Sequence, residues 1–178
     1  MKKYLKPFLA LVIACALLLV CSAGLSGVKE KRLENYRSSV FESMFPEGGD
    51  FEEIPYDGED RNIQAVYRNK DGFIIETKVH GYGSFITSWI AVSRNGSVKD
   101  LKIVDMNETP TLGRRALTSS FISQFRGTEG GLTVGKNADA LSGATITSRS
   151  IVKAINSACE YVIGCDAETG ATKEGEEE

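Results

Sequence analysis

Residues 63–104 read IQAVYRNKDGFIIETKVHGYGSFITSWIAVSRNGSVKDLKIV. Two dipeptides in this stretch, Asp71-Gly72 and Asn95-Gly96, are flanked on both sides by segments rich in β-branched and aromatic residues. Such dipeptides supply the positive φ angles that tight hairpin turns require. The pattern therefore predicts two hairpins built from four strands, at residues 63–67, 73–79, 85–93 and 98–104. Four strands joined in this order form an antiparallel sheet.

Apolar residues at three- and four-residue steps predict helices outside the sheet, at residues 29–45, 114–125 and 147–163. Pro46 ends the first of these. The acidic segment 50–61 is predicted to be irregular. The expected fold class is α+β: an N-terminal transmembrane helix, followed by one domain with an antiparallel sheet of hairpins and packed helices.

An uncharged run of 22 residues, PFLALVIACALLLVCSAGLSGV, occupies residues 7–28. Its length matches the roughly 20 residues that a helix needs to cross a bilayer, and it predicts a single-pass anchor. A signal peptide cleaved near Ser22-Ala23-Gly24 and a lipoprotein modified at Cys21 are the alternatives. Lysine and arginine residues stand on both sides of the run, so the charge count does not fix its orientation.

Composition narrows the classes of protein that fit this chain. Its 178 residues are 42% hydrophobic and 25% charged, with a formal net charge of −3. These values exclude a wholly disordered chain, a polytopic membrane protein and a strongly basic nucleic-acid-binding protein. The chain has one histidine, His80, and no Cys-x-x-Cys pair, so we expect no metal site. Whether Cys159 and Cys165 form a disulfide stays open.

The segment with the most distinctive chemistry is DALSGATITS, residues 139–148. Four hydroxyl side chains and one glycine precede or begin a predicted helix there. The free N–H groups and the dipole at a helix N-terminus favour a negative charge, so the segment could hold a phosphate. An ordinary helix cap rich in serine and threonine is the alternative.

The spacing Asp-x-x-Ser-Gly-Ala-Thr in this segment resembles the flavinylation motif of the FMN-binding domain family. The resemblance implies that Thr145 accepts FMN through a phosphoester bond, which a dedicated flavin transferase makes. Residues 108–113, Glu-Thr-Pro-Thr-Leu-Gly, resemble the family's Glu-Thr-Pro-Gly-Leu-Gly loop beside the flavin, with Thr111 in place of glycine. Besides Thr145, the cofactor-binding residues implied are Glu108, Thr109, Leu112, Gly113, Asp139, Ser142, Gly143, Ala144, Thr147 and Ser148.

Two residues in this set have simpler alternatives. Tyr82 is a possible contact of the flavin ring, but it could instead be a core residue of the sheet. Glu108 could be a plain surface charge. The resemblance covers residues 81–163, which makes it more specific than either motif alone.

Hydropathy, composition and the family resemblance together predict a division of the chain, and the resemblance implies which side of the membrane the domain occupies. The parts are a cytoplasmic N-terminus (1–6), a transmembrane anchor (7–28), a stalk helix with the first hairpin (29–80), the FMN-binding domain core (81–166) and a disordered acidic tail (167–178). We expect a single-pass protein of the cell (inner) membrane with its soluble domain on the outer face.

The resemblance also implies a function. It indicates an electron-transfer subunit of an Rnf-type complex, a non-autonomous part of an oxidoreductase that couples ferredoxin:NAD electron transfer to ion translocation. Its partners would be the other membrane subunits and, transiently, the flavin transferase. The alternatives are the C subunit of a sodium-translocating NADH:quinone reductase, a free-standing extracellular flavin shuttle, and a flavin-free scaffold.

Overall fold

The structure, a computed structural model, describes residues 31–46 and 48–173, with side chains as far as residue 165. The chain divides into two compact units, residues 1–40 and 41–178. Residues 31–44 are helical, which agrees with the helix predicted at 29–45. The predicted anchor, residues 7–28, lies outside the described residues. Within the described part, no helix combines the length and the apolar character needed to cross a membrane.

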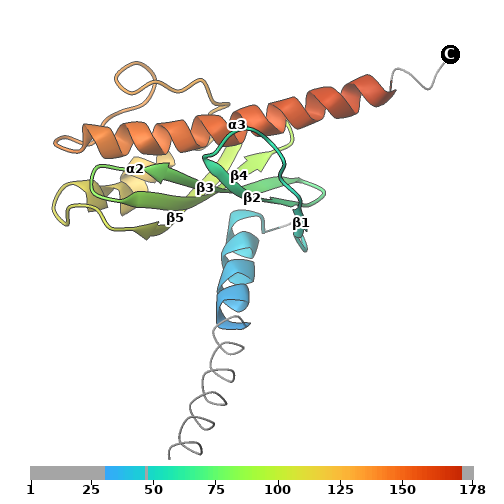
Figure 1. The fold of residues 1–178 in the computed structure, drawn as a ribbon, viewed down its shortest axis with the longest axis horizontal. Helices are drawn as coiled ribbons and strands as arrows, with labels where there is room; N and C mark the ends of the chain where they lie inside the picture. Colours follow the sequence, from blue (N-terminus) through green and yellow to red (C-terminus); the bar gives the residue numbers. More distant parts are fainter. Residues whose placement is uncertain (1–30, 47, 174–178) are drawn as a thin grey trace, which may run out of the picture. The chain divides into compact units, whose positions relative to one another are not determined.

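The second unit is built on a five-stranded antiparallel sheet with strand order β1-β2-β3-β4-β5 (Figure 1). Its strands are β1 (Glu52–Ile54), β2 (Ile63–Arg68), β3 (Gly72–His80), β4 (Phe85–Ser93) and β5 (Val98–Met106). The four predicted strands are confirmed within two residues of their expected ends. The prediction of irregular structure over residues 50–61 is wrong at β1, because this short acidic strand pairs along the edge of the sheet with β2.

The two hairpin turns use different devices. Gly96 has a φ of 81°, as the Asn-Gly dipeptide predicts. Gly72 does not adopt a positive φ, so the backbone conformation predicted for the Asp-Gly dipeptide is wrong. The Asn69 side chain shapes that turn by accepting hydrogen bonds from the N–H groups of Asp71 and Gly72, both at 2.9 Å. Glycine is needed at position 72 because a Cβ there would lie 2.4 Å from the Val92 carbonyl oxygen.

The helices after the sheet are η1 (Gly113–Leu117), α2 (Ser119–Ser123) and α3 (Thr145–Lys173). The single helix predicted at 114–125 is broken, because Thr118 has extended backbone angles, φ −74° and ψ 140°. The last helix begins at Thr145 and continues through residues 167–173, which were expected to be disordered. Alanine, glutamate and lysine in that segment favour a helix, and its single glycine does not end it.

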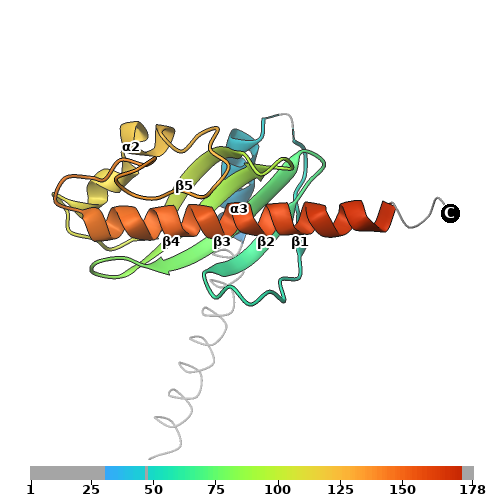
Figure 2. The ribbon, with the colours of Figure 1, turned by 90° about the horizontal axis from the view of Figure 1, so that it is seen from above.

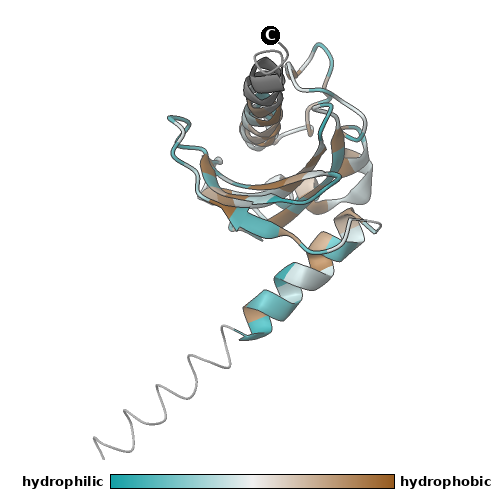
Figure 3. Cartoon of the chain, turned by 90° about the vertical axis from the view of Figure 1, so that its right-hand side faces the viewer, coloured by the Kyte–Doolittle hydropathy of each residue, from teal (hydrophilic) through white to brown (hydrophobic). Residues whose placement is uncertain are grey.

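Helix α3 lies along one face of the sheet (Figure 2), and Figure 3, which views it nearly end-on, shows the sheet curving beneath it. Buried residues of α3, among them Ile151, Ile155 and Val162, share one hydrophobic core with Ile75 and Ile90 of the sheet. This packing fixes where the first turn of α3 begins relative to the ends of the strands.

Aromatic side chains cover the opposite face of the sheet. The Phe41 ring lies 5.4 Å from Phe51, 5.0 Å from Tyr67 and 5.2 Å from Trp89, measured between ring centroids. Two of these pairs are edge-to-face, an arrangement that adds to the free energy gained from burial. Both faces of the sheet centre are therefore packed.

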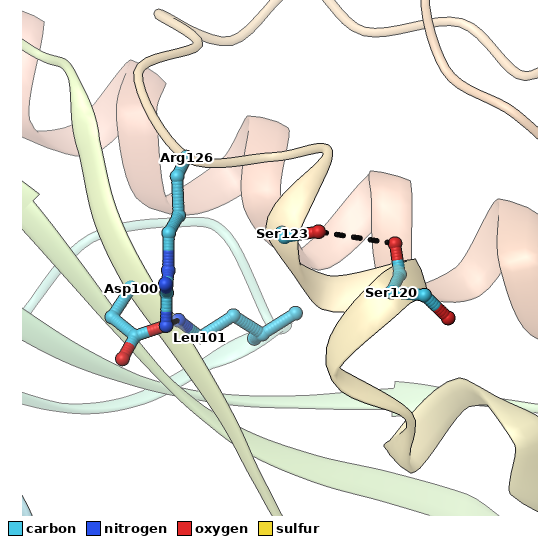
Figure 4. Close-up of polar contacts among 5 residues, drawn as sticks. All are labelled: Asp100, Leu101, Ser120, Ser123 and Arg126. Carbon is cyan, nitrogen blue, oxygen red and sulfur yellow. Dashed lines mark hydrogen bonds and ion pairs between the residues drawn. The ribbon is translucent and has the colours of Figure 1, made fainter.

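The segment that follows α2 is held against β5 by an ion pair (Figure 4). Arg126 Nη2 lies 2.9 Å from Asp100 Oδ1, which also accepts the N–H of Leu101 at 2.9 Å. Figure 4 also shows the Ser123 hydroxyl, which donates to the Ser120 carbonyl at 3.2 Å and closes the short helix α2. Arg126 is more than half exposed, so the pair orients the chain more than it stabilises it.

Candidate functional site

Three segments that are distant in the sequence meet around a cavity of about 500 Å³. They are the turn after β3, the loop after β5 and the start of α3. The lining residues are Tyr82, Glu108, Thr109, Leu112, Gly113, Gly143, Ala144, Thr145, Ile146 and Thr147. A volume between roughly 300 and 1,000 Å³ is typical of a site for a small organic ligand. The two sequence motifs therefore border one cavity.

Not every residue of the predicted set lines this cavity. Asp139, Ser142 and Ser148 do not, whereas the other predicted residues do. One lining residue, Ile146, was missed by the sequence analysis. It is 49% exposed, and the signal that could have found it is a large apolar residue directly after Thr145, the predicted attachment residue.

Thr145 is the first residue of α3, and its side chain is exposed at the cavity. Gly143, two residues earlier, has a φ of 79°, and this turns the chain sharply into the helix. The N–H of Ser148 bonds to the Ala144 carbonyl at 3.0 Å, so the N–H groups of residues 145–147 precede the first helical bond. These groups and the helix dipole favour an anion beside the Thr145 hydroxyl.

Ser148 and Asp139 hold the backbone of this turn through hydrogen bonds outside the cavity. The buried Ser148 hydroxyl accepts the N–H of Leu141 and donates to the Ala144 carbonyl, both at 3.0 Å. The backbone N–H of Asp139 donates to Gln124 Oε1 at 2.7 Å, while the Asp139 side chain is exposed. These two positions hold the backbone of the motif, which explains why they do not line the cavity.

Glu108 is 4% exposed, so the alternative of a surface charge is wrong. Its Oε1 accepts the N–H of Gly83 at 3.0 Å, and its Oε2 accepts the Thr147 hydroxyl at 3.0 Å. Two glycines leave room for the Glu108 side chain. A Cβ added at Gly81 would lie 2.2 Å from Glu108 Oε1, and a Cβ added at Gly113 would lie 2.6 Å from the Glu108 Cβ. A buried carboxyl group requires such partners, because burial without them is costly.

Apolar and aromatic side chains form the open rim of the cavity. Tyr82 is 65% exposed and Leu112 is 41% exposed, so Tyr82 is not a core residue of the sheet. The Leu112 side chain lies against Gly143, where an added Cβ would come within 3.0 Å of Leu112 Cδ2. None of the described non-glycine residues has a positive φ, so Thr111 fits this loop without left-handed strain. The rim offers flat, partly apolar surfaces of the kind that a planar ring contacts.

The part of the chain that surrounds the cavity is similar to a known family. Residues 81–160 match the FMN-binding domain family. All residues that line the cavity fall within this range. The cavity also fits FMN chemically, since it combines helix N–H groups suited to a phosphate with an apolar rim suited to a ring system.

Two curated relatives belong to redox complexes. The chain is 39% identical over 97 residues to the G subunit of the proton-translocating ferredoxin:NAD(+) oxidoreductase complex of Clostridium ljungdahlii, covering 51% of this chain and 52% of that protein. It is 28% identical over 140 residues to the G subunit of the ion-translocating oxidoreductase complex of Methanosarcina acetivorans, covering 71% and 74%. The matched region thus spans about half the length of the first relative.

A solved structure is also similar to this chain. The crystal structure of Shewanella oneidensis NqrC superimposes with a TM-score of 0.44 and 23% identity, covering 52% of this chain and 53% of that one. A likeness at this distance carries no argument about function.

Proposed function

We propose that this chain is an electron-transfer subunit that carries FMN covalently, as a phosphoester of Thr145. The observation that carries the proposal is the position of Thr145: an exposed hydroxyl at the first residue of a long helix, at the edge of the cavity that both motifs line. When bound, FMN supplies electron transfer through its isoalloxazine ring, and the protein supplies attachment and orientation.

The segments around the cavity would bind different parts of the cofactor. The start of α3 would hold the phosphate, because the N–H groups of residues 145–147 precede the first helical hydrogen bond and the helix dipole favours an anion beside them. Leu112, Ile146 and Tyr82 would shield the ring, because they are the large side chains exposed at the rim. Thr109 would offer the ring a polar contact from the same loop.

The Clostridium and Methanosarcina relatives support an Rnf-type complex as the setting of this subunit. The ferredoxin:NAD(+) oxidoreductase activity named for the Clostridium complex is proposed for the assembly that contains this chain. Its partners would be the other membrane subunits and, transiently, a flavin transferase. Residues 7–28 would anchor the chain in the cell (inner) membrane, with the FMN-binding domain on the outer face.

The attachment residue is tested by coexpressing the chain with a flavin transferase and measuring the intact mass. Thr145→Ala should abolish the added flavin mass and the fluorescent band on a denaturing gel. Thr147→Ala, which removes the neighbouring hydroxyl, should still gain both when the reaction is carried to its end point. Flavin that persists in Thr145→Ala would show that the assignment is wrong.

The membrane setting is tested separately from the cofactor. The full chain should stay in the membrane pellet after alkaline carbonate extraction and should copurify with several membrane subunits. Release into the supernatant would favour a cleaved signal peptide, and purification without membrane subunits would favour a free-standing flavin shuttle.

A further inference from the structure

The first turn of α3 offers two threonine hydroxyls, and only one of them is exposed. Thr145 is exposed at the cavity, whereas Thr147, two residues later, is 1% exposed. The Thr147 hydroxyl donates to Glu108 Oε2 at 3.0 Å. The Thr147 hydroxyl is therefore already used in a hydrogen bond within the protein, although Thr147 also lines the cavity.

We propose that Glu108 is a positioning residue for flavin attachment: by accepting the Thr147 hydroxyl it fixes the first turn of α3, which holds Thr145 toward the cavity. This inference rests on the proposed attachment at Thr145 and explains why that hydroxyl is used.

Glu108 is suited to this role because it ties all three walls of the cavity together. One carboxyl oxygen binds Gly83 in the turn after β3, the other binds Thr147 in α3, and Glu108 itself belongs to the loop after β5. The 39 residues that separate Glu108 from Thr147 in the sequence make this a tertiary contact, not a helix cap. Loss of the contact would let the first turn move relative to the rim.

Attachment requires a well-placed hydroxyl oxygen. In the proposed step, the Thr145 oxygen bonds to the flavin phosphorus of an activated donor, a flavin dinucleotide. The phosphoanhydride bond of the donor breaks, the nucleoside monophosphate leaves, and the hydroxyl proton passes to a base of the transferase. No electrons are exchanged. Rates of such steps depend steeply on the position of the attacking atom, so a loosened first turn should slow the transfer.

The chain offers a matched control in the second turn of the same helix. The Ser150 hydroxyl donates to the His80 carbonyl at 2.6 Å, which ties α3 to the end of β3, and it also lies 3.0 Å from the Ile146 carbonyl of its own helix. Ser150 is 9% exposed and does not line the cavity. Removing its hydroxyl therefore weakens the docking of α3 but removes no hydrogen-bond partner of Glu108 or Thr147.

The test measures the initial rate of flavin attachment to the full chain by intact mass, with peptide mapping to locate the flavin. Thr147→Val, which replaces the hydroxyl with a methyl group, should slow attachment at Thr145 about tenfold, the effect expected when a buried carboxyl loses one partner. Thr147→Ser retains the hydroxyl and should restore the rate. Ser150→Ala should stay within about twofold of the wild-type rate, because neither Glu108 nor Thr147 loses a hydrogen-bond partner in this variant.

A double variant tests whether Glu108 acts through Thr147. Glu108→Ala should slow attachment, and adding Thr147→Val should slow it no further, because both changes remove the same interaction. Attachment to Thr147→Val at the wild-type rate would overturn the proposal, as would equal slowing by Ser150→Ala. If the wild-type chain itself gains no flavin at Thr145, the proposed function fails and the inference fails with it. If the wild type is labelled and the variants are labelled equally fast, only the role of Glu108 is lost.

Discussion

Gly143 gives a direct test of whether the turn before α3 controls the site. It has a φ of 79°, and an added Cβ would lie 3.0 Å from Leu112 Cδ2. Gly127 has nearly the same φ, 80°, but no atom lies within 4 Å of its added Cβ. Alanine at either position therefore imposes nearly the same backbone strain, but only alanine at position 143 also contacts a residue that lines the cavity.

The expected loss of stability follows from two opposing effects. Left-handed backbone costs an alanine about 1–2 kcal/mol, and the reduced entropy of the unfolded chain returns about 0.4–1 kcal/mol. Gly143→Ala and Gly127→Ala should each lose about 1 kcal/mol of unfolding free energy, or about 3–4 °C in Tm for a chain of this size. The half-exposed Leu112 side chain can move aside, so the contact adds little to the loss at position 143.

Flavin attachment should separate the two variants. In Gly143→Ala, strain of about 1 kcal/mol is relieved by reorienting the turn, which lowers the correctly placed population of Thr145 about fivefold. Attachment should slow to that extent, whereas Gly127→Ala should match the wild type. Denaturant unfolding and intact-mass time courses on the same preparations give both quantities. Equal attachment rates in the two variants would refute the link between the Gly143 turn and Thr145.

Two further predictions concern Leu112 and Cys159. The Leu112→Ala variant should still be flavinylated, but the absorption fine structure and the reduction potential of its flavin should change. Leu112 is 41% exposed, so the variant should lose less unfolding free energy than the roughly 2–5 kcal/mol lost when a buried leucine is truncated. Denaturant titration measures this loss. An unchanged spectrum and potential would remove residues 108–113 from the site. Burial raises the pKa of the Cys159 thiol from 9.0 to about 11, so peptide mapping after alkylation at pH 8 should find Cys159 protected and Cys165, which is less buried, modified faster. The stability from the neutral thiol is complete below pH 9 and is lost as the pH rises towards 11, which thermal melts across that range would detect.

The strands of the sheet could be predicted from the sequence because their signals are local. Alternating apolar residues around Asn95-Gly96 place β4 and β5 without any knowledge of the rest of the chain. Strand β1 has no such signal, since the acidic sequence Glu-Glu-Ile becomes a strand only by pairing with β2. Gly72 shows the same limit: its requirement for glycine comes from the Val92 carbonyl on the neighbouring strand, 20 residues away.

The predicted site divides along a similar line. A motif names residue types at a spacing, and this was enough to bring Gly143, Thr145 and the 108–113 loop to one cavity. It could not separate the residues that line the cavity from those that shape its wall. Ser148 carries a hydroxyl group just as Thr145 does, but its hydroxyl is hydrogen-bonded to the backbone of Leu141 and Ala144 and does not line the cavity.

Glu108 shows why the remaining part of the site requires the structure. In sequence it is one acidic residue in a turn-rich loop, where a solvated carboxylate is the ordinary expectation. Its burial depends on Gly81 and Gly113, whose missing side chains leave the space that its carboxyl group fills. Once it is buried, its two oxygens need donors, and only the folded chain brings Gly83 and Thr147 to them. The family resemblance places Glu108 beside the flavin, but only the fold shows that it is buried and which donors its carboxyl group binds. The variants of Thr147 and Ser150 test whether this contact positions Thr145.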